Sequence, residues 1–377
     1  MITRAVAAAV LVGVVACATP GPAVAAPAGP TVQPVGPTVL FHITDPRITE
    51  ASGIAVGLAS PGVVYVQNDS GDQARFFALD ARSGRTVATY TVPGATNVDW
   101  EDLAVAPDAR GVPSVWLADI GDNSAARDEI DVYRVDEPHL DASSTDAAAP
   151  TAPPDRWRLR YPDGPTDAES LAVSPHGAAY VVTKTLSGDA RVYALPARAD
   201  SSRVQVLRPL GSLHIGFSGT AGGPNRFGQR TATGAALSRD GAMLAVRTYT
   251  DAYLWRVRGS DVAAAIRTKP IRLALPAQPL GEGVAFDGTR LLIDSERSGS
   301  AVYALALPAV PASQAPRSAT SAAPIQSAPA PADDHRDYPP WAGIGAGLLI
   351  IAMVYLAFRF IGQDQRQRIR DRRRSRR

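Results

Sequence analysis

Cysteine is almost absent from this sequence, which holds one cysteine, Cys17, in 377 residues. An internal disulfide framework is therefore excluded, and so is a cysteine-based zinc site. Histidine is also scarce: the chain has five, and none has the spacing of a zinc site. The fold must be held by buried apolar side chains, and a metal site would have to use oxygen ligands, which suit Ca²⁺ or Mg²⁺.

Lysine is nearly as rare, with only Lys184 and Lys269 among 38 basic residues. The formal net charge is +2, but residues 363–377 contribute +6 through eight arginines and two aspartates, so residues 1–362 carry −4. A mildly acidic body with a basic tail argues against nucleic acid as a partner of the body.

Both ends of the chain carry apolar segments. Residues 1–26 combine an early arginine, a run of Ala, Val and Leu, and closing small residues, which is typical of a signal peptide. Cys17 follows Val-Val-Ala and loosely resembles a lipidation site, although we favour its loss with the signal peptide. The segment Trp341–Ile361 is long enough to span a bilayer, and the arginine-rich tail, residues 362–377, should stay in the cytoplasm. We therefore expect a single-pass protein of the cell membrane with an extracytoplasmic body.

Segments of low complexity delimit that body. Residues 27–37 form a proline-rich lead, and residues 308–340 are dominated by Pro, Ala and Ser, as in an extended stalk. A similar piece, residues 141–154, lies inside the body and is expected to be a surface-loop insertion. The folded domain should therefore span residues 38–307.

The body is a repeat. Five similar units begin with "ASGIAV", "WEDLAV", "AESLAV", "ATGAAL" and "GEGVAF", and their starts lie 49, 68, 64 and 49 residues apart. Each has further short apolar runs, and residues 203–210 read as the fourth run of the third unit. Four short strands per 40–50 residues indicate an all-β fold, a single β-propeller of five four-stranded blades, or six if one hides in the insertions. The fifth unit lacks its fourth strand, so we expect residues 38–44 to complete that blade and close the ring.

Polar residues recur where the first strand of each unit begins and where the second ends, and in a propeller these points share one face. The residues that begin the first strands are Ser52, Glu101, Glu169, Thr233 and Glu282. We expect ligand contacts from residues near them: Asp69, Asp72, Asp99, Asp122, Asn123, Lys184, Arg247 and Glu296.

Turn chemistry explains Ser70–Gly71 in "NDSGD", but it does not explain three glutamates, because glutamate is not a turn former. In a narrow channel the three would repel one another, and they would need Lys184, Arg247, a metal ion or raised pKa values to coexist. The candidate metal ligands are Asp69, Glu101, Asp119, Glu169, Glu282 and Asp294, and the candidate catalytic groups are Glu101, Glu169 and Glu282. The alternative is a structural ring of acids that caps amides of neighbouring blades.

The segments "NDSGD", "DWEDLAV" and "DIGDN" resemble a family of exported actinobacterial propeller proteins, with a likeness over about residues 49–307. More loosely, the body resembles propeller phytases and esterase-like proteins, which implies a Ca²⁺-lined acidic face acting on phosphorylated substrates. This chain departs from that pattern, because only Lys184 and Arg247 fall at the ends of second strands, and no basic cluster is present to hold several phosphates.

Two functions remain open from the sequence. One is a tethered propeller that binds a small molecule, glycan or protein at its acidic face, with or without a divalent cation. The other is a hydrolase, either a metal-assisted phosphoesterase or a carboxylate-driven glycan hydrolase. A serine–histidine–aspartate triad has no local support, since "GFSGT" lacks the spacing of a nucleophile elbow.

Overall fold

The computed structural model describes residues 31–32, 35–140, 145 and 147–307. These residues belong to one compact unit of the chain, residues 1–311. The predicted signal peptide, stalk, membrane span and tail lie outside the described residues. Within the described ranges, no helix combines the length and apolarity needed to cross a bilayer.

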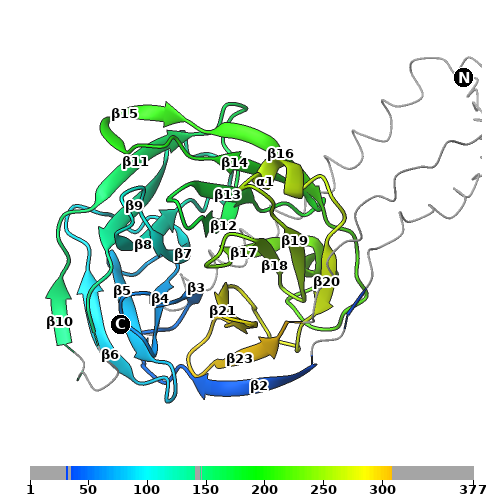
Figure 1. Cartoon of the computed structure of the whole chain (residues 1–377), viewed down its shortest axis with the longest axis horizontal. Helices are drawn as coiled ribbons and strands as arrows, with labels where there is room; N and C mark the ends of the chain where they lie inside the picture. Colours follow the sequence, from blue (N-terminus) through cyan, green and yellow to red (C-terminus); the bar gives the residue numbers. More distant parts are fainter. Residues whose placement is uncertain (1–30, 33–34, 141–144, 146, 308–377) are drawn as a thin grey trace, which may run out of the picture. The chain divides into compact units, whose positions relative to one another are not determined.

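Five antiparallel sheets are arranged around a ring, with the first strand of each sheet innermost (Figure 1). The first blade contains β3 (Ala51–Val56), β4 (Val63–Asn68), β5 (Arg75–Asp80) and β6 (Thr86–Thr91). The second contains β7 (Trp100–Pro107), β8 (Pro113–Asp119), β9 (Ile130–Asp136) and β11 (Asp155–Arg160). The third contains β12 (Ala168–Val173), β13 (Ala179–Thr183), β14 (Asp189–Ala194) and β16 (Arg208–His214).

The last two blades complete the ring. The fourth contains β17 (Ala232–Leu237), β18 (Met243–Thr248), β19 (Asp251–Arg256) and β20 (Ile271–Ala274). The fifth contains β21 (Val284–Asp287), β22 (Arg290–Ile293), β23 (Ala301–Ala306) and the N-terminal strand β2 (Val35–His42). The prediction of an all-β propeller is confirmed, and its blade number is five.

Strand β2 closes the ring, as predicted. It pairs antiparallel with β23, from Val35 opposite Ala306 to His42 opposite Ala301. The fifth blade therefore joins the two ends of the propeller chain, and β2 covers the edge of β23 that would otherwise be open.

Three short strands add to outer edges in the parallel sense. They are β1 (Thr31–Val32) on β20, β10 (Ala147–Pro150) on β6, and β15 (Asp200–Val206) on β11. Residues 203–210 are therefore not one strand, and that prediction was wrong. The run divides at the buried Leu207: β15 is mostly exposed and leaves for the second blade, whereas β16 buries Leu210 and Leu213 in its own blade. Part of the expected loop at 141–154 is the exposed strand β10.

Apolar side chains fill the spaces between neighbouring blades. Tyr65 and Phe76 of the first blade pack with Leu117 and Tyr133 of the second, and Trp100 lies fully buried among them. Two short helical segments, η1 (Arg226–Arg230) and α1 (Val262–Ala265), lie in connections. The blades thus form a rigid frame for the loops at the strand ends.

The inner strands approach one another closely at the ring axis. A Cβ atom on Gly53 would lie 2.7 Å from the Leu103 nitrogen, and one on Gly234 would lie 2.6 Å from the Glu282 carbonyl oxygen. Between them sits Asp102, whose Oδ2 accepts hydrogen bonds from the amides of Leu171 (2.8 Å) and Ala235 (3.1 Å). Its Oδ1 accepts from the Leu103 amide at 2.8 Å. One buried carboxyl therefore links the inner strands β7, β12 and β17.

Candidate functional site

The predicted first-strand residues sit in β-bulges. In four blades the pairing of the first two strands skips one residue, and the skipped residues are Ser52, Glu101, Glu169 and Thr233. In the fifth blade, Glu282 stands two residues before β21. A bulge turns a side chain away from the regular alternation of a strand, and bulges are common beside functional sites. The repeat therefore presents these side chains in the same way in successive blades.

Five carboxyl groups gather there, and we call them the acidic cluster: Asp69, Asp99, Glu101, Asp167 and Glu169. Oxygen atoms of Asp69, Asp99 and Glu101 all lie within 4.8 Å of one another, and so do oxygen atoms of Glu101, Asp167 and Glu169. Glu101 belongs to both groups, and it is 3% exposed. The Ser52 hydroxyl donates a hydrogen bond to Glu101 Oε2 at 3.2 Å.

Lys184 is the cation nearest these acids. Its Nζ atom forms an ion pair with Glu169. Burial raises the pKa of Glu101 and Glu282 well above the usual value, and Lys184 opposes that rise at both. The lysine also lowers the pKa of Asp69 and Glu296, against the effect of their burial. The single positive charge of Lys184 thus acts on five carboxyl groups, those of Asp69, Glu101, Glu169, Glu282 and Glu296. The region therefore carries either excess negative charge or bound protons.

The acids repel one another enough to hold protons near neutral pH. Burial, with repulsion from Asp69, raises the pKa of Asp99 to about 6 and that of Glu296 to about 7. The pKa of Asp69 is also raised, by burial first and by repulsion from Glu50. Both acids of this pair therefore hold protons more readily than an exposed aspartate does.

Buried carboxyl oxygens without partners mark the region. Among the described residues, Oε2 of Glu169 and Oε2 of Glu282 are buried and have no hydrogen-bond partner. A Cβ atom at Gly121 would collide with the carboxyl groups of Glu101 and Asp99, so the absence of a side chain there makes room for both. Buried carboxylate oxygens without partners are costly unless something binds them.

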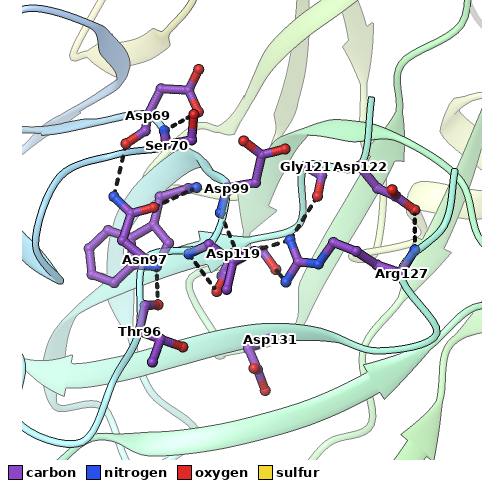
Figure 2. A network of polar contacts seen from close by, with 12 residues as sticks. Asp69, Ser70, Thr96, Asn97, Asp99, Asp119, Gly121, Asp122, Arg127 and Asp131 are labelled. Carbon is purple, nitrogen blue, oxygen red and sulfur yellow. Dashed lines mark hydrogen bonds and ion pairs between the residues drawn. The ribbon is translucent and has the colours of Figure 1, made fainter. Parts of the chain in front are cut away.

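Two predicted acids at the end of β8 have structural partners instead (Figure 2). Asp119 forms an ion pair with Arg127 at 2.9 Å and accepts a hydrogen bond from the Asp99 amide at 3.0 Å. Asp122 accepts from the amides of Ala126 and Arg127 and so fixes its own loop. The amide of Asp122 donates to Asp167 at 2.8 Å, which holds that carboxyl in the acidic cluster. These acids position the cluster without joining it.

Arg247 and Asp294 form a second buried unit outside the acidic cluster. The Arg247 guanidinium donates to the carbonyl oxygens of Gly283 (2.6 Å) and Asp294 (2.9 Å) and to Gln278 (2.6 Å). Asp294 Oδ1 accepts from the Gly283 amide at 2.7 Å, and burial raises the pKa of Asp294 to about 6. Arg247 is 0% exposed, so its guanidinium holds the fourth and fifth blades together rather than facing solvent.

In the turn "NDSGD", one aspartate belongs to the acidic cluster and the other stabilises the turn. Asp69 joins the acidic cluster, whereas Asp72 accepts from the Asn68 amide group at 2.7 Å and pairs with Arg75 at 2.8 Å. Asn123 is exposed in the loop after β8. Asp72 thus stabilises the turn that carries Asp69.

Sequence reasoning missed Asp167, although its position in the repeat could have revealed it. It stands two residues before the bulge residue Glu169, as Asp99 stands before Glu101 and Glu50 before Ser52. The carbonyl group of Asp167 accepts a hydrogen bond from the Lys184 amide, and that of Glu50 accepts one from the Asp69 amide. Aligning the units by the bulge would have placed all three acids in one ring.

No protein-family model matches this sequence, and no curated protein is similar to it. The solved structures to which the chain is similar include the PQQ-bound aldose sugar dehydrogenase of Streptomyces coelicolor, with 12% identity, a TM-score of 0.41 and coverage of 72% of this chain and 98% of that one. They also include the Cps50 (Swd1) β-propeller domain of Myceliophteria thermophila, with 8% identity, a TM-score of 0.35 and coverage of 68% and 84%. A nidogen/laminin complex matches with 13% identity, a TM-score of 0.35 and coverage of 66% and 73%.

At these identities and TM-scores the neighbours carry no argument about ligand or activity. The resemblance to exported actinobacterial propellers therefore stays a prediction from the sequence segments. Any inference about function must come from the acidic cluster itself.

Proposed function

We propose that this protein is a ligand-binding propeller whose acidic cluster holds a divalent cation, Ca²⁺ or Mg²⁺, through which the ligand is bound. The observation that supports it most is the shared Glu101: two groups of three carboxyl oxygens meet at one buried side chain. Two oxygens on opposite sides of a Ca²⁺ ion stand about 4.8 Å apart, so each group is compact enough for one ion.

The charge balance supports the same proposal. Among the described residues, Glu169 is the one acid of the cluster with an ion-pair partner, Lys184. Without a metal cation several of the five acids must keep protons, as the raised pKa values of Asp99 and Glu101 indicate. A divalent ion would replace those protons and would use the oxygen of Glu169 that has no partner. Of the residues predicted as ligands, Asp69, Glu101 and Glu169 fit this role best.

We further propose that the propeller is extracytoplasmic and tethered to the cell membrane. The support comes from sequence patterns outside the described residues: the signal-like segment 1–26, the apolar span Trp341–Ile361 and the basic tail 362–377.

A hydrolase is the second candidate, and the Asp69–Asp99 pair favours it. Two neighbouring carboxyl groups whose pKa values are both raised can share one proton and act as general acid and general base. Asp99, with a pKa of about 6, would be the acid, and Glu101 and Glu169 lie beside it as further candidates. Under this alternative, Glu101→Gln would abolish turnover of a phosphoester or glycoside while the fold remains intact.

Thermal unfolding of the purified full-length protein tests the cation site. We expect Ca²⁺ or Mg²⁺, compared with EDTA, to stabilise the folded state by about 2.7 kcal/mol at 100 times the dissociation constant. For a domain of this size the midpoint should rise by about 5–10 °C. If Ca²⁺, Mg²⁺ and Mn²⁺ all leave the midpoint unchanged, the cation site is refuted.

Two variants make the test specific. Glu101→Gln removes the shared ligand, and Gly121→Ala pushes Glu101 and Asp99 apart, so each should abolish the rise. Gly216→Ala is the matched control, because a Cβ atom there would meet open space. A rise that survives in Glu101→Gln would place the cation elsewhere.

A further inference from the structure

A second group of charged residues lies in the connection between β16 and β17. Two arginines stack on one phenylalanine there: the guanidinium carbons of Arg226 and Arg230 lie 4.6 and 4.2 Å from the ring centre of Phe217. The same two groups lie 5.9 and 5.4 Å from the ring centre of Phe227, and the two rings are 6.0 Å apart. We call these four residues the Arg–Phe platform.

The platform differs from every other stacked arginine in the described part of the chain. Five other arginines lie over aromatic rings, and each also forms an ion pair with a carboxylate: Arg47 with Asp45, Arg75 with Asp72, Arg134 with Asp108, Arg156 with Asp131 and Arg191 with Asp163. Arg226 and Arg230 have no such partner among the described residues. No aspartate or glutamate occurs anywhere in residues 214–230.

An exposed apolar surface accompanies the two unmatched charges. Phe217 and Phe227 are 44% and 41% exposed, although phenylalanine is usually buried. The Nε atom of Arg230 is buried and has no hydrogen-bond partner. Both guanidinium groups contact the same ring, so two like charges are held close together without a counter-ion.

We propose that the Arg–Phe platform binds an oxyanion, a carboxylate or a phosphate group of the ligand, in the place that an aspartate takes at the other five stacked arginines. Stacking fixes the plane of a guanidinium group and leaves its N–H groups free to donate to two oxygens of an anion. The exposed rings of Phe217 and Phe227 would contact the apolar part of the same molecule.

Contacts lead from the platform toward residues that surround the proposed cation site. Its helical turn packs on Tyr249, which a Cβ atom at Gly228 would approach to 3.1 Å, and burial together with the nearby Glu282 carboxylate raises the pKa of Tyr249. On the other side, Arg230 packs against Gly188, in the turn that follows Lys184. A ligand that reaches both sites would be an anion bound by the two arginines and by the cation. That joint use rests on the proposed function, whereas oxyanion binding by the platform does not.

The test titrates the full-length protein with sodium phosphate or sodium acetate, against sodium chloride of equal ionic strength. Metal ions are first removed from the protein on a chelating resin, so the cation site makes no contribution and no dissolved carboxylate chelator competes for the platform. We expect phosphate, acetate or both to raise the unfolding midpoint. Binding of phosphate alone would identify a phosphorylated ligand, and binding of acetate alone would identify a carboxylate.

Variants assign that effect to the platform. Arg226→Gln and Arg230→Gln should each weaken anion binding by about tenfold, because each removes a charge-assisted hydrogen bond. Arg198→Gln, an exposed arginine in the connection after β14, is the matched control and should bind the anion normally. The midpoint of each variant without anion reports whether it is folded.

Absence of binding, or binding that persists in both platform variants, overturns the inference. A platform that binds an anion in a protein without a cation response would refute the proposed cation site and leave the oxyanion subsite standing.

Discussion

Asp102 and Glu101 are neighbours in the sequence, and both are buried, yet their surroundings are opposite. The Asp102 carboxyl accepts hydrogen bonds from three backbone amides, which come from the first strands of three blades. Glu101 receives one hydrogen bond, from Ser52, and faces other carboxyl groups. Burial alone therefore does not separate a structural acid from a functional one, whereas the supply of hydrogen-bond donors does.

The largest effect on stability should come from replacing Asp102, the buried acid whose hydrogen bonds are all made. Asp102→Ala leaves three buried amides without an acceptor, and since each costs about 1–3 kcal/mol, we expect a loss of about 3–9 kcal/mol in the free energy of unfolding. Asp102→Asn can keep one oxygen toward Leu171 and Ala235, so it should lose less. Urea unfolding measures both, and an Asp102→Ala protein as stable as the parent would contradict the structural role.

The pH dependence of stability should reveal the acids around Glu101, which accept fewer hydrogen bonds than Asp102 does. Carboxyl groups in the unfolded chain release protons near pH 4, but Asp99 keeps its proton to about pH 6 and Glu296 to about pH 7. The folded state therefore binds more protons in this window, and the stability of the cation-free protein should fall as the pH rises from about 4 to 7.

Other acids act in the opposite direction at lower pH. Asp45 and Asp108 have folded-state pKa values of about 2, so their contribution is lost only as the pH falls below about 4. The urea midpoint in EDTA should thus be higher at pH 5 than at pH 8, and Glu101→Gln should flatten the difference. A urea midpoint that rises from pH 5 to pH 8 would show that deprotonation of these acids does not destabilise the folded state.

A smaller effect is expected from removing the positive charge of Lys184, which pairs with Glu169 in the cluster. Lys184→Met should lower the stability of the cation-free protein by about 1–3 kcal/mol, between the values for exposed and buried ion pairs. The same change should enlarge the midpoint rise produced by Ca²⁺, because the lysine no longer competes with the ion. Lys269→Met, at an exposed position, is the matched control and should alter neither quantity.

The smallest effect should fall on the turn that carries Asp69. Asp72→Asn removes the ion pair with Arg75, which is worth about 1 kcal/mol or less, and the response to Ca²⁺ should persist. Asp69→Asn should abolish that response with little loss of stability. Equal cation responses in the two variants would mean that both aspartates are only turn residues.

The sequence was sufficient to predict the architecture, because similar apolar runs at a regular spacing identify a propeller without any knowledge of contacts. It was insufficient for the strand assignment around Leu207. Neither residues 200–206 nor residues 208–214 show a regular alternation, since Leu210 and Leu213 stand three residues apart. Only their burial distinguishes the strand that joins another blade from the one that completes its own. Pairing between units is a long-range property that a local pattern does not contain.

The site was predicted in outline, and its details depended on contacts that spacing cannot supply. The ring of acids followed from the repeat, but the β-bulges that turn Glu101 and Glu169 out of the strand alternation have no marker in one sequence. Asp119 was grouped with the ligands because its partner, Arg127, stands eight residues away in a loop of unpredictable path. Arg247 was predicted at the acidic face because it lies at the end of a second strand. Its side chain instead donates a hydrogen bond to the buried carbonyl oxygen of Gly283.

The pairing of β2 with β23 sets an order for the synthesis of this protein. Strand β2 leaves the ribosome some 260 residues before its partner, which at about 5–20 residues per second is a delay of roughly 15–50 s. During that time four blades can fold in turn, while β2 keeps its backbone groups unpaired and open to other chains. Strand β2, made before any of the blades, is thus the last to find its place, and the nascent chain depends on whatever keeps that strand from aggregating until the ring is closed.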